Sequence, residues 1–556
     1  PPPLFQAEDG IRDLSLSLVG SEMCIRDSLY ILNAYRGLAV CDVSVPDSPT
    51  MTGRCPINGE PIEMYIRNGM AYVIVSVPQP VLYAEQGAAS DFAPNIYETL
   101  SRVEVIDVAD PSNPRIVDTL DLEGRVTDSR IVGDILYVVS SETQVFYYGV
   151  RAEDGASTVA ADDAETASSD GANVYVAAVD LSDPGDIAEV DRVDFGGSAR
   201  QIHVTESAIF IASDPLDYGS DSMDITYVDI SDPAGLIRTR GEFRVQGTVQ
   251  DEFKMDYDNG YFRVCTYQWD VETRGLSRLY VFDVTDPDAA AEVGSLELGE
   301  GEQLFATRFD GDRAYMVTFE QKDPLWVIDL GDPANPEIKG ELEVPGWSTH
   351  IQAMGDHLVA LGIDDTENQR RVAVSLFDVA DPEAPALIER VSFGEGDGWS
   401  WSTASHDVKA FTVLDEMGLI LLPYTTSFYD GGYYQSENRL QLIDYAPDDL
   451  TARGWVTQKG NVLRGRSYSD RLFSVSTEEL QVIDASDRDK PRVSADLALA
   501  ENVVDFIPLE NGYGVKVTES GGDYTLQAVD MDSPDDIAGE TVLVDLFYAT
   551  HFVNGN

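Results

Sequence analysis

Residues 325–336 read LWVIDLGDPANP: alternating apolar positions, then Asp, an aliphatic residue, a small residue and the pair Asp-Pro. We call the first aspartate, here Asp329, the anchor. Close copies are VEVIDVADPSNP (103–114), VAAVDLSDP (176–184), ITYVDISDP (225–233), LYVFDVTDP (279–287) and VSLFDVADPEAP (374–385), and weaker copies surround Asp42, Asp444, Asp484 and Asp530. The ten anchors lie 40 to 73 residues apart, and six of the nine spacings fall between 40 and 54. Such a period is typical of propellers and repeat arrays.

Each repeat predicts four short strands. After Asp329 the chain turns at DPANP, returns as EIKGELEV, and continues as WSTHIQAM and HLVALGI before the next anchor. Alternation of apolar and polar residues in these segments is typical of half-buried strands. No window of about a dozen residues carries a helical stripe bounded by caps. We therefore predict an all-β chain.

The anchor phrase has a structural explanation. Proline fixes φ at about −65° for a turn, and the aspartate before it can accept backbone hydrogen bonds as an Asx-turn. We expect each anchor to end a strand, and its aspartates to serve structure and not chemistry.

Composition excludes several classes of protein. The chain has 556 residues, a net charge of −62 and 43% hydrophobic residues. This apolar content supports a large core. The negative charge argues against nucleic acid and anionic membrane surfaces as partners. No apolar run approaches the roughly 18 to 20 residues of a membrane-spanning helix, so no transmembrane segment is predicted.

The first 28 residues are unlike the repeats. They include FQAEDGIRDLSLSLVGSEMCIRDS, which resembles a translated sequencing-adapter read-through and carries neither strand alternation nor a helical period. We interpret residues 1–28 as an artefact outside the fold. The true N-terminus, with any signal peptide or lipid-anchor cysteine, would then be missing.

A family resemblance rests on four segments. They are GEQLFATRFDGDRAYMVTFEQKDPLWVIDLGDPANPEIKGELEVPGWSTHIQAMGDHLVALGID (301–364), QDEFKMDYDNGYFRVCTY (250–267), VTDSRIVGDILYVVSS (126–141), and VAVSLFDVADPEAP followed by HDVKAF (406–411). Together they resemble secreted bacterial and archaeal proteins that carry a C-terminal β-propeller domain. The resemblance covers roughly residues 100–445. The family has no established activity, so it supplies no functional residues.

The resemblance implies that residues 29–556 form one β-propeller of four-stranded blades. Ten anchors exceed the four to eight blades that are typical. We expect about eight blades, with terminal repeats that are partial or lie outside the ring. A segment that the family places before its first repeats is missing here, which indicates truncation and leaves closure of the ring open.

Two cysteines occupy equivalent repeat positions. Most repeats have apolar residues one before and thirteen after the anchor, and the first repeat has Cys41 and Cys55 there. A hairpin would bring such positions opposite each other. We predict either a disulfide, worth roughly 3 kcal/mol in the chain-entropy model, or two small buried thiols.

Two further groups are candidate sites. The loop with Asp214, Asp217, Asp221 and Asp224 could gather oxygen ligands for calcium, but lacks EF-hand spacing and also fits a solvated acidic loop. Aromatic residues that could hold a sugar or peptide, or pack between blades, are Trp347, Trp399, Trp401, Tyr433 and Tyr434, with His406 nearby. No other cofactor is expected.

No catalytic motif is present: we find no G-x-S-x-G, Walker loop, H-E-x-x-H or paired C-x-x-C. We therefore predict a monomeric, secreted or lipid-anchored binding or scaffold module without catalysis, with a protein, peptide or glycan as ligand. The alternative is a propeller hydrolase or lyase that uses carboxylates in the central channel.

Overall fold

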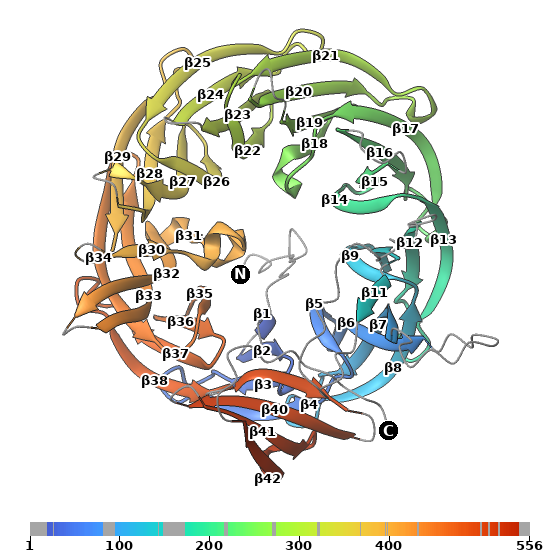
Figure 1. Ribbon diagram of the computed structural model, residues 1–556, viewed down its shortest axis with the longest axis vertical. Coiled ribbons are helices and arrows are strands. Elements are labelled where there is room, and N and C mark those ends of the chain that lie inside the picture. The colour runs from blue at the N-terminus through green and yellow to red at the C-terminus, as the bar shows by residue number, and fades with distance from the viewer. Residues whose placement is uncertain are drawn as a thin grey trace, which may run out of the picture.

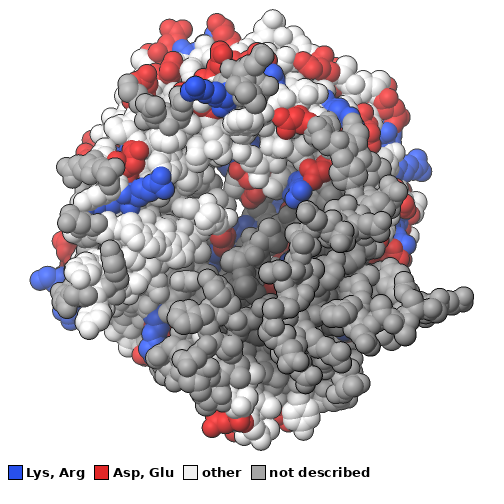
Figure 2. Space-filling view, viewed as in Figure 1, with Lys and Arg blue, Asp and Glu red and all other residues white. Residues whose placement is uncertain are grey.

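The computed structural model describes residues 19–25, 27–81, 95–142, 144–147, 173–215, 221–269, 274–319, 323–366, 369–394, 396, 398–430, 433–500, 503–509, 512–520 and 523–543. They form ten antiparallel sheets joined by turns and short 3-10 helices. The prediction of an all-β chain is therefore confirmed. The sheets stand like spokes around a common centre (Figure 1), and a space-filling view shows a hollow there (Figure 2).

The first five sheets, blades 1 to 5, follow in chain order. Blade 1 has β1 (Val19–Ile25), β2 (Ser28–Asn33), β3 (Gly37–Asp42) and β4 (Thr50–Cys55). Blade 2 has β5 (Glu60–Arg67), β6 (Met70–Val81), β7 (Asn95–Asp107) and β8 (Arg115–Leu122), with β11 (Gln144–Tyr147) paired to β7. Blade 3 has β9 (Arg125–Val132), β10 (Ile135–Ser141), β12 (Asn173–Asp180) and β13 (Ala188–Gly196). Blade 4 has β14 (Ser198–Val204), β15 (Ala208–Asp214), β16 (Ser222–Asp229) and β17 (Arg238–Gln246). Blade 5 has η1 (Glu252–Lys254), β18 (Met255–Asp258), β19 (Tyr261–Gln268), β20 (Leu276–Asp283), η2 (Pro287–Ala289) and β21 (Ala291–Leu298).

The remaining sheets are blades 6 to 9 and sheet 10. Blade 6 has β22 (Gln303–Asp310), β23 (Arg313–Phe319), β24 (Asp323–Asp329) and β25 (Glu337–Val344). Blade 7 has β26 (Trp347–Met354), β27 (His357–Asp364), β28 (Arg371–Asp378) and β29 (Ala386–Phe393). Blade 8 has β30 (Trp399–Trp401), η4 (Thr403–Ser405), η5 (Val408–Ala410), β31 (Thr412–Leu414), η6 (Asp415–Met417), β32 (Leu419–Asp430), β33 (Tyr433–Ala446) and β34 (Asp449–Gln458). Blade 9 has β35 (Val462–Tyr468), β36 (Arg471–Ser476), β37 (Glu479–Asp484) and β38 (Arg492–Ala498), and sheet 10 has β39 (Val503–Pro508), β40 (Tyr513–Ser520), β41 (Asp523–Asp530) and β42 (Ser533–Leu543).

Hydrophobic clusters between neighbouring blades close the ring. Nine clusters of the described residues join each blade to the next, from blade 1 to blade 9 and back. In the closing cluster, Phe473 and Val475 of blade 9 pack with Leu29 and Ile31 of blade 1. The ring therefore has nine blades where we expected about eight, and it is closed. Burial of apolar faces between sheets is the main stabilising contribution.

Sheet 10 lies outside the ring, against blade 1 (Figure 1). Tyr35, in the β2–β3 turn, packs its ring edge-on against Phe506 at a centroid distance of 5.4 Å. Its hydroxyl donates a hydrogen bond to the Pro534 carbonyl oxygen at 2.7 Å. This confirms the expectation that a repeat unit lies outside the ring.

The anchors behave as predicted. In nine of the ten repeats the anchor ends the third strand of its sheet, and its carboxylate accepts a hydrogen bond from the backbone N–H two residues later. A repeat counted from anchor to anchor therefore spans two blades. After Asp329, β25 completes blade 6, whereas β26 and β27 open blade 7.

At eight of the nine junctions of the ring, contacts between described residues join the turn after an anchor to the outer strand of the preceding blade. In five blades the contact position is a glycine, because a Cβ there would overlap a backbone oxygen of the next blade's turn. Gly340 of β25, for example, lies against the carbonyl oxygen of Pro382 in blade 7. The others are Gly53, Gly241, Gly294 and Gly454.

Aspartate replaces this glycine in two blades and makes the same contact by hydrogen bonding. Asp118 of β8 accepts the backbone N–H of Ile187 at 2.7 Å, and Asp191 of β13 accepts that of Ile237 at 2.9 Å. Both partners lie in the turn of the following blade. The turn therefore contacts the outer strand in these two blades as well, through a hydrogen bond to aspartate instead of close approach to glycine.

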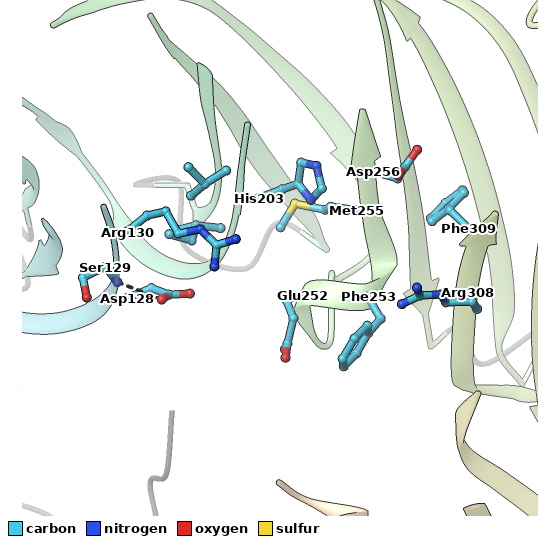
Figure 3. A pocket seen from close by; sticks show the side chains of 12 residues that line it. Asp128, Ser129, Arg130, His203, Glu252, Phe253, Met255, Asp256, Arg308 and Phe309 are labelled. Carbon is cyan, nitrogen blue, oxygen red and sulfur yellow. Dashed lines mark hydrogen bonds between the residues drawn. The ribbon is translucent and has the colours of Figure 1, made fainter. Parts of the chain in front are cut away.

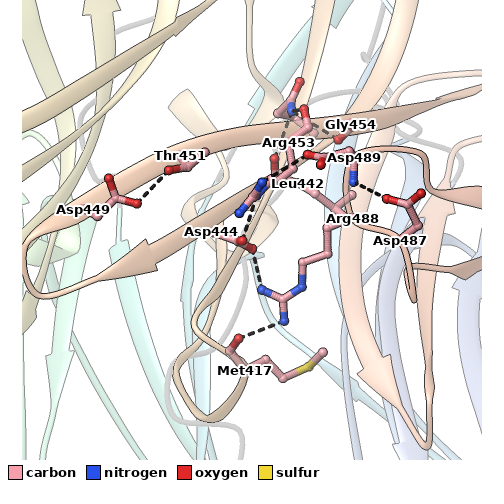
Figure 4. A network of polar contacts seen from close by, with 11 residues as sticks. Met417, Leu442, Asp444, Asp449, Thr451, Arg453, Gly454, Asp487, Arg488 and Asp489 are labelled. Atoms are coloured by element: carbon pink, nitrogen blue, oxygen red, sulfur yellow. Dashed lines mark hydrogen bonds and ion pairs between the residues drawn. The ribbon is translucent and has the colours of Figure 1, made fainter.

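Blade 8 departs from the pattern at its own anchor (Figure 4). Asp444 makes ion pairs with Arg453 (2.8 Å) and with Arg488 of the blade 9 turn. Arg488 also donates to the Met417 carbonyl oxygen at 3.0 Å, and its own carbonyl oxygen accepts the Gly454 N–H at 2.8 Å. The blade 9 turn is thus fixed on blade 8.

The predicted Cys41–Cys55 disulfide is wrong, because the two cysteines are free and lie on opposite faces of blade 1. Cys41 packs against blade 9, and Cys55 packs against blade 2. The cause is a β-bulge: Val40 pairs with Gly53 but Cys41 pairs with Met51, so one extra residue reverses the alternation of faces along β4. The alternative, two buried thiols, is the arrangement found.

The structure includes part of the segment that we interpreted as an adapter artefact. Val19–Ile25 form β1, which pairs with β2. The expectation that residues 1–28 lie outside the fold is therefore not met by Val19–Ile25, whereas the interpretation of their origin stays a prediction.

We expect Gly340→Val to destabilise the protein by at least about 1–3 kcal/mol, because the side chain must displace the blade 7 turn. Thermal or denaturant unfolding measures this. Gly539→Val is the control, since a Cβ there meets no atom within 4 Å, and it should change stability by less than about 0.5 kcal/mol. Equal effects of the two substitutions would contradict the turn contact.

A second prediction concerns ring closure at the blade 1 turn. Asp47 accepts hydrogen bonds from Arg471 (2.8 Å) and Ser494 (2.6 Å) of blade 9, and these lower its pKa from 3.8 to about 2. Because the pKa of Asp47 is lower in the folded state, its ionised carboxylate stabilises the folded protein above pH 3.8. This stabilisation is lost as the pH falls toward 2. Asp47→Asn should therefore lower the melting temperature at neutral pH, and the difference from wild type should shrink between these two pH values.

The control for this prediction is Asp332→Asn, whose carboxylate accepts hydrogen bonds only within its own turn among the described residues. A difference between wild type and Asp47→Asn that stays constant down to pH 2 would rule out the assigned role.

Candidate binding site in the channel wall

In eight of the nine blades, the innermost strand has a described residue at an equivalent register position. We call these residues the channel row. Each is the residue of the innermost strand that pairs with the third residue of the second strand of its blade. Its described members are Tyr65, Arg130, His203, Asp256, Arg308, Gln352, Thr412 and Arg466. The row is therefore mostly polar, although the inter-blade clusters directly behind it are apolar.

A cavity of about 200 Å³ opens on this wall across blades 3 to 6. Four members of the channel row line it: Arg130, His203, Asp256 and Arg308. Figure 3 shows Arg130 and Arg308 extending toward one another from opposite sides, with η1 between them. Apolar lining comes from Phe253, Met255 and Phe309, and carboxylates from Asp128 and Glu252.

Arg308 has an uncommitted guanidinium. Its Nε is buried without a hydrogen-bond partner, and no carboxylate of the described residues forms an ion pair with it. The nearby Asp256 is held by Arg263, whose Nε donates to Asp256 Oδ2 at 2.7 Å. A buried donor without an acceptor costs about 1–3 kcal/mol, so this position suits an external anion.

Two further basic residues, Lys254 and His350, lie near Arg308. Lys254, which is 1% exposed, donates to Asp251 Oδ2 (2.7 Å) and to the Phe305 carbonyl oxygen (3.1 Å), and so joins blade 5 to blade 6. His350 packs edge-on to Phe253 at a centroid distance of 5.2 Å. Burial first, and then the Arg308 and Lys254 cations, lower the pKa of His350 to about 4, so its imidazole is neutral at pH 7.

A second cavity, of about 460 Å³, lies at the other end of the inner strands of blades 3 to 5. Arg200 on its wall is paired with Asp214, at 2.6 Å between Nη2 and Oδ2. We place the candidate site in the first cavity because Arg308 Nε there has no hydrogen-bond partner among the described residues.

The aromatic candidates do not form one platform. Trp347 belongs to blade 7 and packs against Phe305 and Phe319 of blade 6, at centroid distances of 6.0 and 4.8 Å. Its position fits the alternative that these rings pack between blades. Trp399 and Trp401 lie in β30 of blade 8, and Trp399 is 50% exposed.

The other members of this group lie in blade 8 as well. Tyr433 is 75% exposed where β33 begins, and His406 is the exposed residue that ends η4. The side chain of Tyr434 lies outside the described residues. A ligand role for the exposed aromatic residues stays a prediction.

The calcium prediction also stays a prediction. Asp214 and Asp224 are paired with Arg200 and Arg244, and Asp217 lies outside the described residues. Among the residues that the structure does describe, no group of three or more His, Cys, Asp or Glu could hold a metal ion.

The sequence reasoning missed the channel-row arginines, although the sequence carries a signal for them. Arg130, Arg308 and Arg466 each begin the pattern R-x-x-x-D-x-x-[YF], which continues to Tyr137, Tyr315 and Phe473. In each case the arginine and the aromatic residue are paired across the first two strands.

Comparison with known proteins agrees with this architecture. The model of the family described as "Beta propeller domain" matches residues 25–488. The chain belongs to this β-propeller family. The match ends in the blade 9 turn, and so leaves sheet 10 outside the family domain as well as outside the ring. The β-propeller family expected from the sequence is thereby confirmed, as is the propeller fold.

Two archaeal relatives are similar to the chain. Uncharacterized protein MJ1554 of Methanocaldococcus jannaschii is 24% identical over 83% of this chain and 73% of its own length. An uncharacterized protein of Archaeoglobus fulgidus is 32% identical over 46% of this chain and 36% of its own length. Neither name gives an activity.

Solved structures are more distant. BamB from Moraxella catarrhalis has 13% identity and a TM-score of 0.35, with 72% of this chain and 97% of that chain covered. The computationally designed protein Ika8 has 10% identity and a TM-score of 0.37, with 74% and 92% covered. Separately, none of the helices in the described residues is long and apolar enough to cross a membrane.

Proposed function

We propose that this propeller is a binding module whose channel-wall cavity takes a small ligand with a carboxylate or phosphate group. The observation that carries the proposal is the uncommitted Arg308 guanidinium on the cavity wall. A planar guanidinium can donate two parallel hydrogen bonds to such a group. The site therefore recognises charge and geometry together.

The rest of the cavity supports this assignment. Phe253, Met255 and Phe309 offer apolar area for the body of a ligand. Arg130 faces the cavity from the opposite side (Figure 3). The wall also carries the carboxylates of Asp128, Glu252 and Asp256, so an anion would be recognised by the placement of Arg308 and not by a positive net charge of the cavity.

Catalysis is the alternative function. Asp128 and Glu252 line the same cavity, which is the observation that favours a hydrolase or lyase. Asp256 is engaged by Arg263 and is less suited to act as a base. Turnover of a bound ligand that is abolished by Asp128→Asn or Glu252→Gln would establish this alternative.

We also infer that the protein is exported, as a secreted or lipid-anchored monomer. The acidic composition and the resemblance to secreted propeller proteins support this inference. A peptide or glycan with an acidic group is a natural larger ligand for the same cavity.

The test is isothermal titration calorimetry at fixed ionic strength with inorganic phosphate, succinate and benzoate. We expect wild type to bind at least one probe and Arg308→Gln to weaken that binding about tenfold or more, because a charge-assisted hydrogen bond is lost. Arg308→Lys keeps the charge and should have an intermediate affinity.

Arg115→Gln is the matched control, since Arg115 is 67% exposed on an outer strand and pairs with Asp107. It should leave binding unchanged. Equal affinities of wild type and Arg308→Gln, or no binding of any probe by wild type, would refute the proposal.

A further inference from the structure

Blades 8 and 9 are neighbours in the ring (Figure 1), but their hairpins differ in length. Strands β32 and β33 of blade 8 have 12 and 14 residues, whereas β36 and β37 of blade 9 have 6 each. Gln458, which ends β34, donates hydrogen bonds through Nε2 to the carbonyl oxygens of Ser474 and Glu479, both at 3.0 Å. These two residues lie close to the tip of the blade 9 hairpin, so the blade 8 hairpin extends beyond blade 9 past the level of Gln458.

Three aromatic side chains lie on one face of the blade 8 hairpin. Residues that are paired across neighbouring strands point to the same side of a sheet, and so do residues two apart along one strand. Trp401 pairs with Thr425 and Trp399 pairs with Ser427. Tyr429 follows Ser427 by two residues on β32 and therefore faces the same way. We call the group of Trp399, Trp401 and Tyr429 the blade 8 platform.

The platform lies on the side of blade 9 but is open to solvent. The row that includes Trp401 is level with the tip of blade 9, because backbone pairing connects Trp401, Thr425, Asn438 and Gln458 across the sheet. Trp399 and Tyr429 lie beyond this level, where they are 50% and 66% exposed. Their rings therefore present apolar area that the described part of blade 9 does not cover.

The side chains beside these rings are polar and uncharged. The Thr425 hydroxyl donates to Asn438 Oδ1 at 2.7 Å, and the hydroxyls of Ser427 and Ser436 are 3.4 Å apart. Ser436 is exposed, and a hydroxyl or amide group with one partner can still bond to others. No described residue of these paired rows carries a charge, although the net charge of the chain is −62.

We propose that the blade 8 platform binds an uncharged glycan. Flat aromatic rings bury the C–H face of a sugar ring, while hydroxyl and amide groups beside them exchange hydrogen bonds with sugar hydroxyls. Side chains two residues apart on a strand are roughly 7 Å apart, so Trp399 and Trp401 can contact successive parts of an extended chain of sugars. A charged ligand would find no opposite charge in these rows.

This site is separate from the channel-wall cavity, whose lining comes from blades 3 to 6. The two sites differ in chemistry as well, because the cavity offers the Arg308 guanidinium and the platform offers rings and neutral polar groups. The glycan site therefore does not rest on the proposed function, and each proposal can fail without the other.

The experiment is isothermal titration calorimetry of the whole chain with cellohexaose, xylohexaose and maltohexaose. We expect wild type to bind at least one of these oligosaccharides. Trp399→Ala and Tyr429→Ala should each weaken that binding about fivefold or more, because ring area that the sugar covers is lost. Binding by wild type should change by less than about twofold when sodium chloride is raised, because the ligand is uncharged.

Tyr433→Ala is the matched control. Tyr433 belongs to the same hairpin and is 75% exposed, but it pairs with Asp430 and therefore faces the opposite side from Tyr429. Its substitution should leave the affinity within about twofold of wild type, less than 0.5 kcal/mol. Arg308→Gln should also leave glycan binding unchanged.

Several outcomes would overturn the glycan site. They are no binding of the three oligosaccharides by wild type, or equal loss of binding in Tyr433→Ala and Trp399→Ala. Binding of an uncharged proline-rich decapeptide that depends on Trp399, without binding of any oligosaccharide, would assign the platform to a protein partner instead. A dimer in sedimentation velocity that Trp399→Ala converts to a monomer would assign it to a second copy of this chain.

Discussion

The contact between the turn of one blade and the outer strand of the blade before it sets the geometry of the ring. The residue of the outer strand at this contact either leaves room for a backbone oxygen of the turn, as Gly340 does, or accepts a backbone N–H of the turn, as Asp118 does. At ring closure the roles are reversed, because Ser494 on the outer strand of blade 9 donates a hydrogen bond to Asp47 of the blade 1 turn. Because this contact recurs at eight of the nine junctions, we infer that it helps to set the rotation between neighbouring blades.

Much of the fold could be predicted from sequence because its signals are local. An anchor such as Asp329 ends a strand and caps a turn within a few residues, so pattern and structure coincide. Three features could not be predicted in this way. The bulge beside Cys41 adds one residue without a sequence mark and reverses the faces of β4. A terminal repeat outside the ring is expected, but the sequence does not say which one, because sheet 10 carries an anchor, Asp530, like the blades and lies outside through its packing on Tyr35. The number of blades depends on contacts between residues far apart in sequence.

The candidate site also depends on contacts between residues that are far apart in sequence. Trp347 looked like a ligand platform because it is a large aromatic residue near others in sequence, but its neighbours in space are Phe305 and Phe319 of another blade. The pattern R-x-x-x-D-x-x-[YF] that begins at Arg308 does not by itself indicate a binding site. It becomes informative once the register of the inner strands and the absence of a described carboxylate partner are known.

The charge distribution connects fold and function. Carboxylates are spread around the rim of the face shown in Figure 2, and many cap turns or pair with arginine there. On the channel wall, carboxylates such as Asp256 and Asp407 are engaged by Arg263 and Arg464, which leaves Arg308 and Arg466 uncommitted. The cavity on this wall thus places Arg308 beside the carboxylates of Asp128, Glu252 and Asp256.

The most direct test of the architecture is an electron cryomicroscopy or crystallographic map viewed along the channel. It should show nine radial sheets in an unbroken ring, with blade 9 packed on blade 1 and a tenth sheet outside the ring beside blade 1. A ring with eight or ten sheets, or a gap between blades 9 and 1, would contradict the account.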